Sequence, residues 1–229
     1  MSSCTWANLR TTTMAKQKKA KKHHRKNTSI MSRSDIPFSQ RMQYQRISDI
    51  KEIRDYSAKI TMFCISIALH KLEGIGYKRL VRFSLHFKEL IDEFYEDVEV
   101  GMYRAARRME QLGMPISGEF QYVRVPEFNR RKQEQYNNAL ESSQAAQICG
   151  TIAINDVFGL GQSKLQNISQ MVQELTQRYA SEGDGFLFDE MKNIGFPVID
   201  GKVIACLDDN DNPITYKKWL EGQSNGLSC

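Results

Sequence analysis

Two short glycine motifs are the residues of this chain best suited to contact a phosphate group. Gly74-Ile75-Gly76 and Gly159-Leu160-Gly161 each separate two stretches that have the apolar periodicity of helices. Glycine permits an unusual turn, and the helix that follows offers unpaired N–H groups at the positive end of its dipole. Basic side chains follow the first motif at Lys78, Arg79 and Arg82. This spacing predicts phosphate binding at the first motif, while a tight turn between closely packed helices is the alternative at both.

A dense basic block lies near the N-terminus. Residues 16–26 hold seven Lys and Arg, and no acid occurs before Asp35. Like charges in one run predict disorder in isolation, and phosphate contacts that release counterions make binding steeply salt-dependent. A solvated tail that aids solubility is the alternative. The predicted nucleic-acid-binding residues of the block and of the first motif are Lys16, Lys18, Lys19, Lys21, Lys22, Arg25, Lys26, Gly74, Gly76, Lys78, Arg79 and Arg82.

The basic character belongs to this block rather than to the whole chain. The formal net charge is +5, but without the block and Arg10 the remaining 24 of the 32 Lys and Arg face 27 Asp and Glu. A hydrophobic content of 41% suffices for a packed core. An apolar run long enough for a membrane, a secretory signal and a cysteine pattern for zinc are all absent from the sequence. We therefore expect a cytoplasmic protein without a membrane partner, metal or cofactor.

Residue types that could support catalysis are present but scattered. His70 and His86 are candidate bases, although the sequence places no nucleophile or carboxylate with either, so a packing or hydrogen-bonding role is favoured. Residues 208–212 begin like a calcium loop, but Pro213 stands where that motif needs Gly, which favours a hairpin loop. Five acids look like a candidate acid–base or metal cluster, yet a solvated helix end is the default: Asp92, Glu93, Glu96, Asp97 and Glu99. Without a phosphate-binding Walker loop, nucleophile elbow or dinucleotide fingerprint, no enzymatic activity is expected.

The glycine motifs also resemble the helix-hairpin-helix family, in which such a hairpin presents backbone N–H groups to a DNA phosphate. The resemblance covers about fifteen residues per motif and departs from the family at Leu80 and Leu165, where a small residue is usual. The run from Ala68-Leu69-His70 to Leu80 is, in addition, similar to small helical proteins of prophages and mobile elements of Gram-positive bacteria. That likeness implies a phage or mobile-element origin and no particular activity.

The elements that must position these residues belong to an internal sequence repeat. Cys64–Gly118 and Cys149–Gly201 share a pattern at an offset of 85 residues, which falls to 82 after a short indel between Tyr95 and Met109. Matches on both sides of one indel indicate a duplication in which each copy buries its apolar face against the other. Met14 opens a typical start, so residues 1–13 are expected to be an over-extended reading frame.

Apolar periodicity predicts three helices in each copy. They are expected at 38–72 (with a possible break at 55–57), 77–95 and 101–112, then at 129–158, 162–180 and 186–194, with 181–185 as a loop. Gly113 and Gly195 are predicted left-handed caps, each followed by a proline that stops the helix. Strands are predicted at 119–125, 202–207 and 214–216.

Together these patterns predict a mainly α fold. Two tandem three-helix repeats would pack about a pseudo-twofold axis, followed by a small C-terminal β-hairpin. The predicted organisation is a disordered basic tail (1–33), repeat one (34–126), repeat two with the hairpin (127–220) and a loose tail (221–229). The favoured function is a non-enzymatic, nucleic-acid-associated accessory protein of a phage or mobile element. The alternative is a protein-interaction module for virion assembly, counter-defence or regulation, and the sequence leaves the oligomeric state open.

Overall fold

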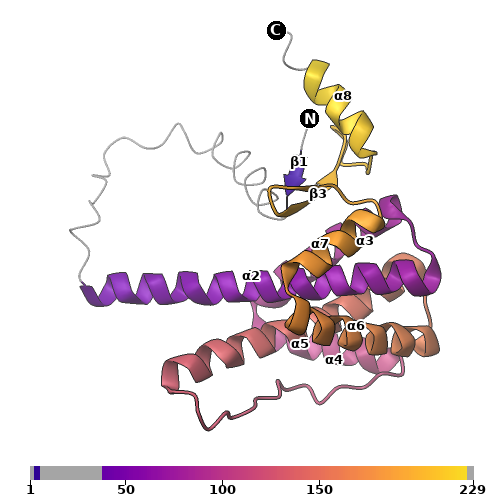
Figure 1. Ribbon diagram of the computed structural model, residues 1–229. Coiled ribbons are helices and arrows are strands. Elements are labelled where there is room, and N and C mark those ends of the chain that lie inside the picture. The colour runs from indigo at the N-terminus through magenta and orange to yellow at the C-terminus, as the bar shows by residue number, and fades with distance from the viewer. Residues whose placement is uncertain (1–2, 6–37, 226–229) are drawn as a thin grey trace, which may run out of the picture. The chain divides into compact units, whose positions relative to one another are not determined.

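The computed structural model describes residues 3–5 and 38–225, with side chains described from residue 48 to residue 222. The described residues divide into two compact units, Ile53–Val203 and the remainder. The chain is mainly α-helical, as predicted (Figure 1). The larger unit contains α2 (Phe38–Glu73) from Ile53 onward, α3 (Tyr77–Glu96), α4 (Val98–Gln111), α5 (Arg130–Phe158), α6 (Gln162–Glu182) and α7 (Asp184–Asn193).

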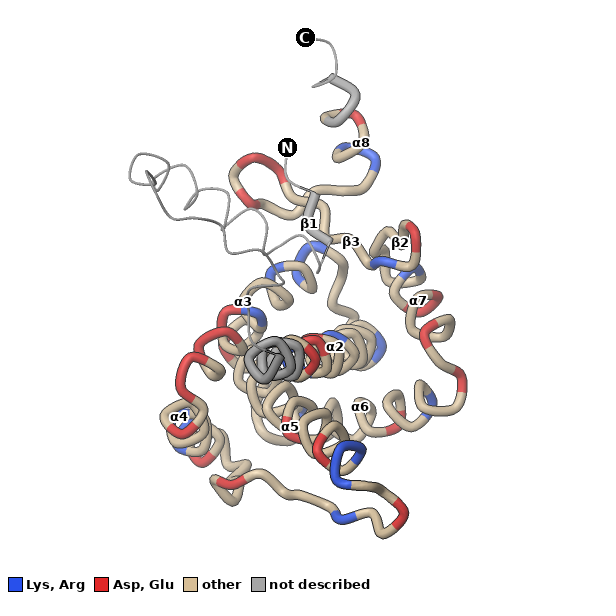
Figure 2. The backbone as a smooth tube through the Cα atoms, turned by 90° about the vertical axis from the view of Figure 1, so that its left-hand side faces the viewer, with Lys and Arg blue, Asp and Glu red and all other residues tan. Residues whose placement is uncertain are grey.

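Helix α2 is the centre of the larger unit. Every residue from Ile60 to Leu69 is buried. Figure 2 looks along this helix and shows α3, α5, α6 and α7 placed around it. A helix that is apolar on all sides suits such a position, and the polar exceptions bond within the helix: Thr61 Oγ1 donates to Ser57 O at 3.0 Å. The helix is continuous, so the break considered at residues 55–57 does not occur.

Glycines end the third helix of each predicted copy in the same way. Gly113 after α4 and Gly195 after α7 have φ of 71° and 98°. The next residue closes the cap in both cases, because Met114 N donates to Met109 O at 2.9 Å and Phe196 N to Met191 O at 3.0 Å. The predicted loop 181–185 is shorter than expected, since the left-handed Gly183 alone separates α6 from α7.

The segment between α4 and α5 is extended but is not a strand. The alternating run 119–125 was predicted as an edge strand, and that prediction is wrong because no described strand lies beside it. Glutamine side chains of α5 take the partner's place: Gln121 N donates to Gln144 Oε1 at 3.0 Å, and Val125 N to Gln133 Oε1 at 2.9 Å. The pattern identified the backbone conformation but not the hydrogen-bonding partner.

A small antiparallel hairpin follows α7, earlier than predicted. β2 (Val198–Ile199) pairs with the first residues of β3 (Lys202–Cys206) in the register Val198↔Val203 and Ile199↔Lys202. The two turn residues, Asp200 and Gly201, have φ of 49° and 68°, as the tight Asp-Gly hairpin turn requires. The prediction placed this turn at 208–212 instead.

The smaller unit contains the end of the chain and one further strand. β1 (Ser3–Thr5) pairs antiparallel with residues 204–206 of β3. The predicted strand 214–216 is wrong: Leu207 and Pro213 form an isolated bridge, and α8 (Tyr216–Asn225) begins directly afterwards. This helix was not predicted, and it reaches into the range expected to be a loose tail. Asp208 Oδ1 closes the loop by accepting the N–H groups of Asn210 and Asn212, both at 2.9 Å.

Candidate nucleic-acid interface

The first glycine motif joins α2 to α3 through a turn with one left-handed residue. Gly74 has φ of 62°, and its N–H donates to His70 O at 3.0 Å, which ends α2. Ile75 is 4% exposed and anchors the turn in the core. Gly76 is extended (φ −84°, ψ 166°) and precedes α3 without any side-chain cap. The first N–H groups of α3 therefore lie next to a residue that has no side chain.

The second motif repeats this geometry between α5 and α6. Gly159 has φ of 66°, and its N–H donates to Asn155 O at 2.7 Å. Gly161 is extended (φ −82°, ψ 174°), and α6 also begins without a side-chain cap. The exposed Gly159 and the half-buried Leu160 leave this turn less embedded than the first.

His70 forms a hydrogen bond within the first turn. Its Nδ1 lies 3.1 Å from Ile75 O. Asn155, the residue 85 positions later, donates from Nδ2 to Leu160 O at the same distance of 3.1 Å. A carbonyl oxygen only accepts, so His70 donates from a protonated Nδ1. The hydrogen-bonding role favoured for His70 is confirmed.

The two glycines of each motif have different reasons to be glycine. Gly74 and Gly159 adopt a positive φ, which L side chains rarely do. Gly76 and Gly161 have a φ open to any residue, and no described atom lies within 4 Å of a Cβ built on either. Close helix packing, the alternative reading of these motifs, therefore does not explain Gly76 or Gly161.

The predicted basic residues near the first motif have different surroundings. Lys78 and Arg82 are exposed and make no hydrogen bond or ion pair with a described residue. Arg79 is also exposed, but its guanidinium carbon lies 5.0 Å from the ring centre of Phe158. Phe158 ends α5 directly before the second motif, so this contact brings the two turns together.

A second contact joins the turns and neutralises Lys164, the basic residue that follows the second motif in sequence. Lys164 Nζ forms an ion pair with Glu73, the last residue of α2. The two glycine motifs, which are 85 residues apart in sequence, therefore lie side by side. Sequence analysis missed both Glu73 and Phe158, because neither has a local feature that pairs it with a distant residue. The seven basic residues of the block at 16–26 lie outside the described residues.

Two residues of the predicted acidic cluster, Asp92 and Asp97, serve the helices themselves. Asp97 Oδ1 accepts a hydrogen bond from Val100 N at 3.2 Å and caps α4, and Asp92 pairs with Lys88 within α3.

His86, the second candidate base, contacts a carboxylate of another helix. Its Nε2 is 3.0 Å from Asp156 Oδ2, which links α3 to α5. Arg108 of α4 also donates to Asp156. Burial alone would raise the pKa of Asp156, but the hydrogen bonds from Arg108 and His86 outweigh it and lower that pKa.

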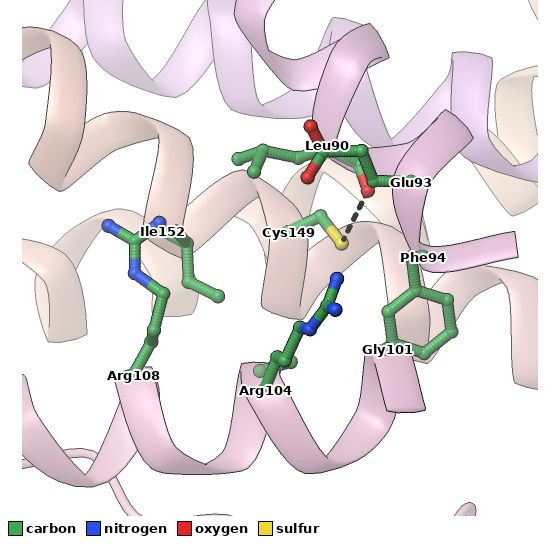
Figure 3. Close-up of a pocket in the computed structure, with 9 residues that line it drawn as sticks. Leu90, Glu93, Phe94, Gly101, Arg104, Arg108, Cys149 and Ile152 are labelled. Carbon is green, nitrogen blue, oxygen red and sulfur yellow. Dashed lines mark hydrogen bonds between the residues drawn. The ribbon is translucent and has the colours of Figure 1, made fainter. Parts of the chain in front are cut away.

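A small pocket lies among α3, α4 and α5, with a volume of about 120 Å³ (Figure 3). It is lined by the apolar side chains of Leu90, Phe94 and Ile152 and by the charged Glu93 and Arg104. Burial raises the pKa of the Cys149 thiol at its base to about 12, and Glu93 adds to that rise. This thiol is protonated at neutral pH and unsuited to nucleophilic chemistry.

Comparison of the chain with family models, with curated proteins and with solved structures gives no match. Among the described residues, no group of three or more His, Cys, Asp or Glu is placed to hold a metal ion. Within the same residues, no helix is both long enough and apolar enough to cross a membrane.

Proposed function

We propose that this chain is a non-enzymatic, nucleic-acid-associated accessory protein of a phage or mobile element, and that its paired glycine turns contact phosphate. The proposal rests chiefly on Gly76 and Gly161. Neither backbone conformation nor packing requires glycine at these positions. A glycine that the fold does not need is explained if an external group approaches the backbone closely. Its occurrence at both turns favours one ligand surface that spans them.

The chemistry beside these glycines suits an anion. Both α3 and α6 begin without a side-chain cap, and each helix N-terminus presents the positive end of a helix dipole to a phosphate oxygen. Lys78 and Arg82 add two exposed charges beside the first turn. In this proposal the basic block at 16–26 supplies most of the affinity without sequence preference, and the turns position the chain on the nucleic-acid backbone.

Serine at Gly76 and Gly161 separates binding from folding. A serine at the residue before a helix accepts a hydrogen bond from an N–H of the first turn, so the Gly76→Ser/Gly161→Ser chain should be more stable by a few tenths of a kcal/mol. The same serine fills the open space and uses a donor that phosphate would need. We expect about tenfold weaker binding, about 1.4 kcal/mol, by fluorescence anisotropy with a labelled duplex. Unchanged affinity together with unchanged or raised stability would overturn the role of the turns.

Charge removal offers a second test with a matched control. Lys78→Ala/Arg82→Ala should weaken binding and reduce the slope of log affinity against log salt by roughly 1.8, since each lost phosphate contact removes about 0.9. Arg130 and Lys132 are exposed at the other end of α5, where Lys132 lies about 39 Å along the helix from Phe158. Arg130→Ala/Lys132→Ala makes the same change in net charge and should leave the slope nearly unchanged.

The contribution of the basic block is tested by deleting it. A chain that lacks residues 16–26 but keeps β1 should bind much more weakly than the full chain in a filter-binding assay, and its affinity should depend less on salt. Equal affinities that do not respond to salt would refute the role of the block. This outcome is independent of the glycine turns, which remain in both chains.

We further propose that the helical unit arose by duplication and that its two copies pack about a pseudo-twofold axis. Reciprocal contacts between positions related by the two offsets support this. Lys71 Nζ pairs with Glu190 Oε1 at 2.8 Å, and their counterparts, Asp156 and Arg108, also form an ion pair. The signs of the charges are exchanged between the two pairs, while the positions correspond.

Two further correspondences support the same arrangement. Gln162 Nε2 donates to Gly113 O at 2.7 Å, and at the counterpart positions a Cβ on Gly195 would lie 3.4 Å from Tyr77 Cβ. Gly150 is the counterpart of Ile65, and a Cβ built on it would lie only 2.3 Å from Ile65 Cδ1. A residue that touches its own counterpart is expected where a twofold axis passes.

A further inference from the structure

The extended segment between α4 and α5 has one hydrogen-bonding side that is already occupied. Gln144 Nε2 donates to Gln121 O at 2.7 Å, and Gln133 Nε2 donates to Val123 O at 2.7 Å. The same two glutamines accept from the N–H groups of Gln121 and Val125. In an extended chain, the backbone groups of alternate residues point to opposite sides. Residues 121, 123 and 125 therefore face α5.

The other side of this extended segment has open backbone groups, like the edge of a strand. The backbone groups of Phe120, Tyr122 and Arg124 point away from the glutamines and make no hydrogen bond to a described residue. The side chains there are accessible, with Tyr122 55% and Val123 51% exposed. An extended row of unpaired N–H and C=O groups is a template for another strand.

The segment is held in this conformation before any partner arrives. Tyr122 Oη donates to Glu141 Oε2 at 3.2 Å, and the ring centre of Phe120 lies 6.1 Å from that of Phe94. Together with the glutamine contacts, these anchors fix the backbone, so little conformational entropy remains to be lost when a strand pairs with it. Phe, Tyr and Val are also residues that strands favour.

We propose that residues 120–124 pair as an antiparallel β-strand with the same residues of a second copy of this chain. A twofold axis at Tyr122 puts Tyr122 opposite Tyr122 of the second copy, and Phe120 opposite Arg124. This register satisfies the outward groups of both strands with about six hydrogen bonds. Pairing places the two Tyr122 rings against each other at the centre. On either side, the guanidinium of Arg124 lies against the ring of Phe120 of the other copy.

Charge and length favour a second copy as the occupant. Residues 119–125 carry one acid, Glu119, and one base, Arg124, so two identical segments do not repel each other. The segment is bounded by Gly118, which has a positive φ, and by Pro126, which has no N–H to donate. These two residues limit pairing to the residues that this register uses. A joint of this size is small, and we expect a weak dimer that forms at roughly tens to hundreds of micromolar.

The oligomeric state of the full chain without nucleic acid tests the proposal. Sedimentation velocity over a range of concentrations should show a monomer–dimer equilibrium. Tyr122→Pro removes an outward N–H at the twofold axis and should weaken the dimer at least tenfold. Val123→Pro is the matched control, because its N–H faces α5 and has no described acceptor, so the dimer should persist. Tyr122→Phe isolates the loss of the hydroxyl bond to Glu141 and should also dimerise.

Hydrogen exchange locates the pairing by residue. In the wild-type chain, the amides of Tyr122 and Arg124 should exchange at least tenfold more slowly at high than at low protein concentration. A chain that stays monomeric at all concentrations overturns the proposal, even if a foreign extended peptide binds the edge. A dimer that Tyr122→Pro and Val123→Pro weaken equally also overturns it, because dimerisation would then not depend on which side of the strand loses its N–H. Both results are independent of nucleic-acid binding.

Discussion

The contact between Gly150 and Ile65 allows the crossing of α2 and α5 to be tested quantitatively. A Cβ on Gly150 would lie 2.3 Å from Ile65 Cδ1 and 3.6 Å from Phe87 Cε2. Alanine favours a helix over glycine by about 1 kcal/mol. Displacing a buried side chain in a packed core costs about 1–3 kcal/mol. We therefore expect Gly150→Ala to lower the free energy of unfolding by up to about 2 kcal/mol.

Shortening the opposing side chain should rescue this loss. Ile65→Val removes Cδ1 and alone costs about 0.5–1.5 kcal/mol. When Ile65→Val is combined with Gly150→Ala, the vacated space accepts the new methyl group, and the gain in helix propensity offsets the lost methylene. The double variant should then be about as stable as the wild type, with a coupling energy of about 1–3 kcal/mol between the two sites.

Urea unfolding followed by far-UV circular dichroism measures all four chains of this cycle. Gly185→Ala is the control for helix propensity, because its Cβ would meet no described atom within 4 Å. It should not lower stability. Effects of Gly150→Ala and Ile65→Val that add within about 0.5 kcal/mol would refute the close crossing.

Three further outcomes follow from the described contacts. The lowered pKa of Asp156 means that the unfolded state binds more protons than the folded state. The contribution of Asp156 to stability is therefore present above the unfolded pKa of about 4 and is lost as pH falls through the folded pKa. In the Asp156→Asn chain, the free energy of unfolding should fall less steeply as the pH is lowered. Burial raises the pKa of Cys64 to about 11 and of Cys149 to about 12, so peptide mapping should find both unlabelled by a thiol reagent at about pH 8 until urea unfolds the chain. Asn155→Ala removes the bond to Leu160 O and should cost about 1 kcal/mol in urea unfolding, and the more conservative Asn155→Ser should not recover it, since its hydroxyl is too short to reach.

The helices could be predicted from sequence because their ends carry local signals. Gly113 and Gly195 take left-handed conformations that few other residues tolerate, and a proline follows each after one intervening residue. The apolar periodicity between such points is long and regular. Predicted and observed limits therefore differ by at most three residues for α2 to α7, whereas α8 was not predicted.

The strands were harder to predict because a strand depends on a partner elsewhere in the chain. Alternation at 119–125 correctly indicates an extended backbone, but the hydrogen bonds come from Gln133 and Gln144 on a helix. At 214–216 the β-branched and aromatic residues suggested a strand, whereas the chain turns at Pro213 and starts α8. Local composition carries no information about which segment lies alongside.

Only part of the candidate site could be predicted, because the rest depends on contacts between residues that are distant in sequence. The glycine motifs are local, and the sequence indicates where they lie. Their proximity depends on Arg79 reaching Phe158 and on Lys164 reaching Glu73, which are contacts between distant positions. That the fold does not require glycine at positions 76 and 161 could come only from the structure, because it depends on the backbone angles and on the empty space around each residue.

The central position of α2 has a consequence for synthesis on the ribosome. This helix emerges before the helices that cover it, and its apolar residues from Ile60 to Leu69 must wait for α7, which ends at Asn193. At ordinary elongation speeds that delay is on the order of ten seconds. During this time the nascent chain exposes an apolar helix. Binding by a chaperone, or transient packing of α2 against the newly made α3, would protect the chain from aggregation.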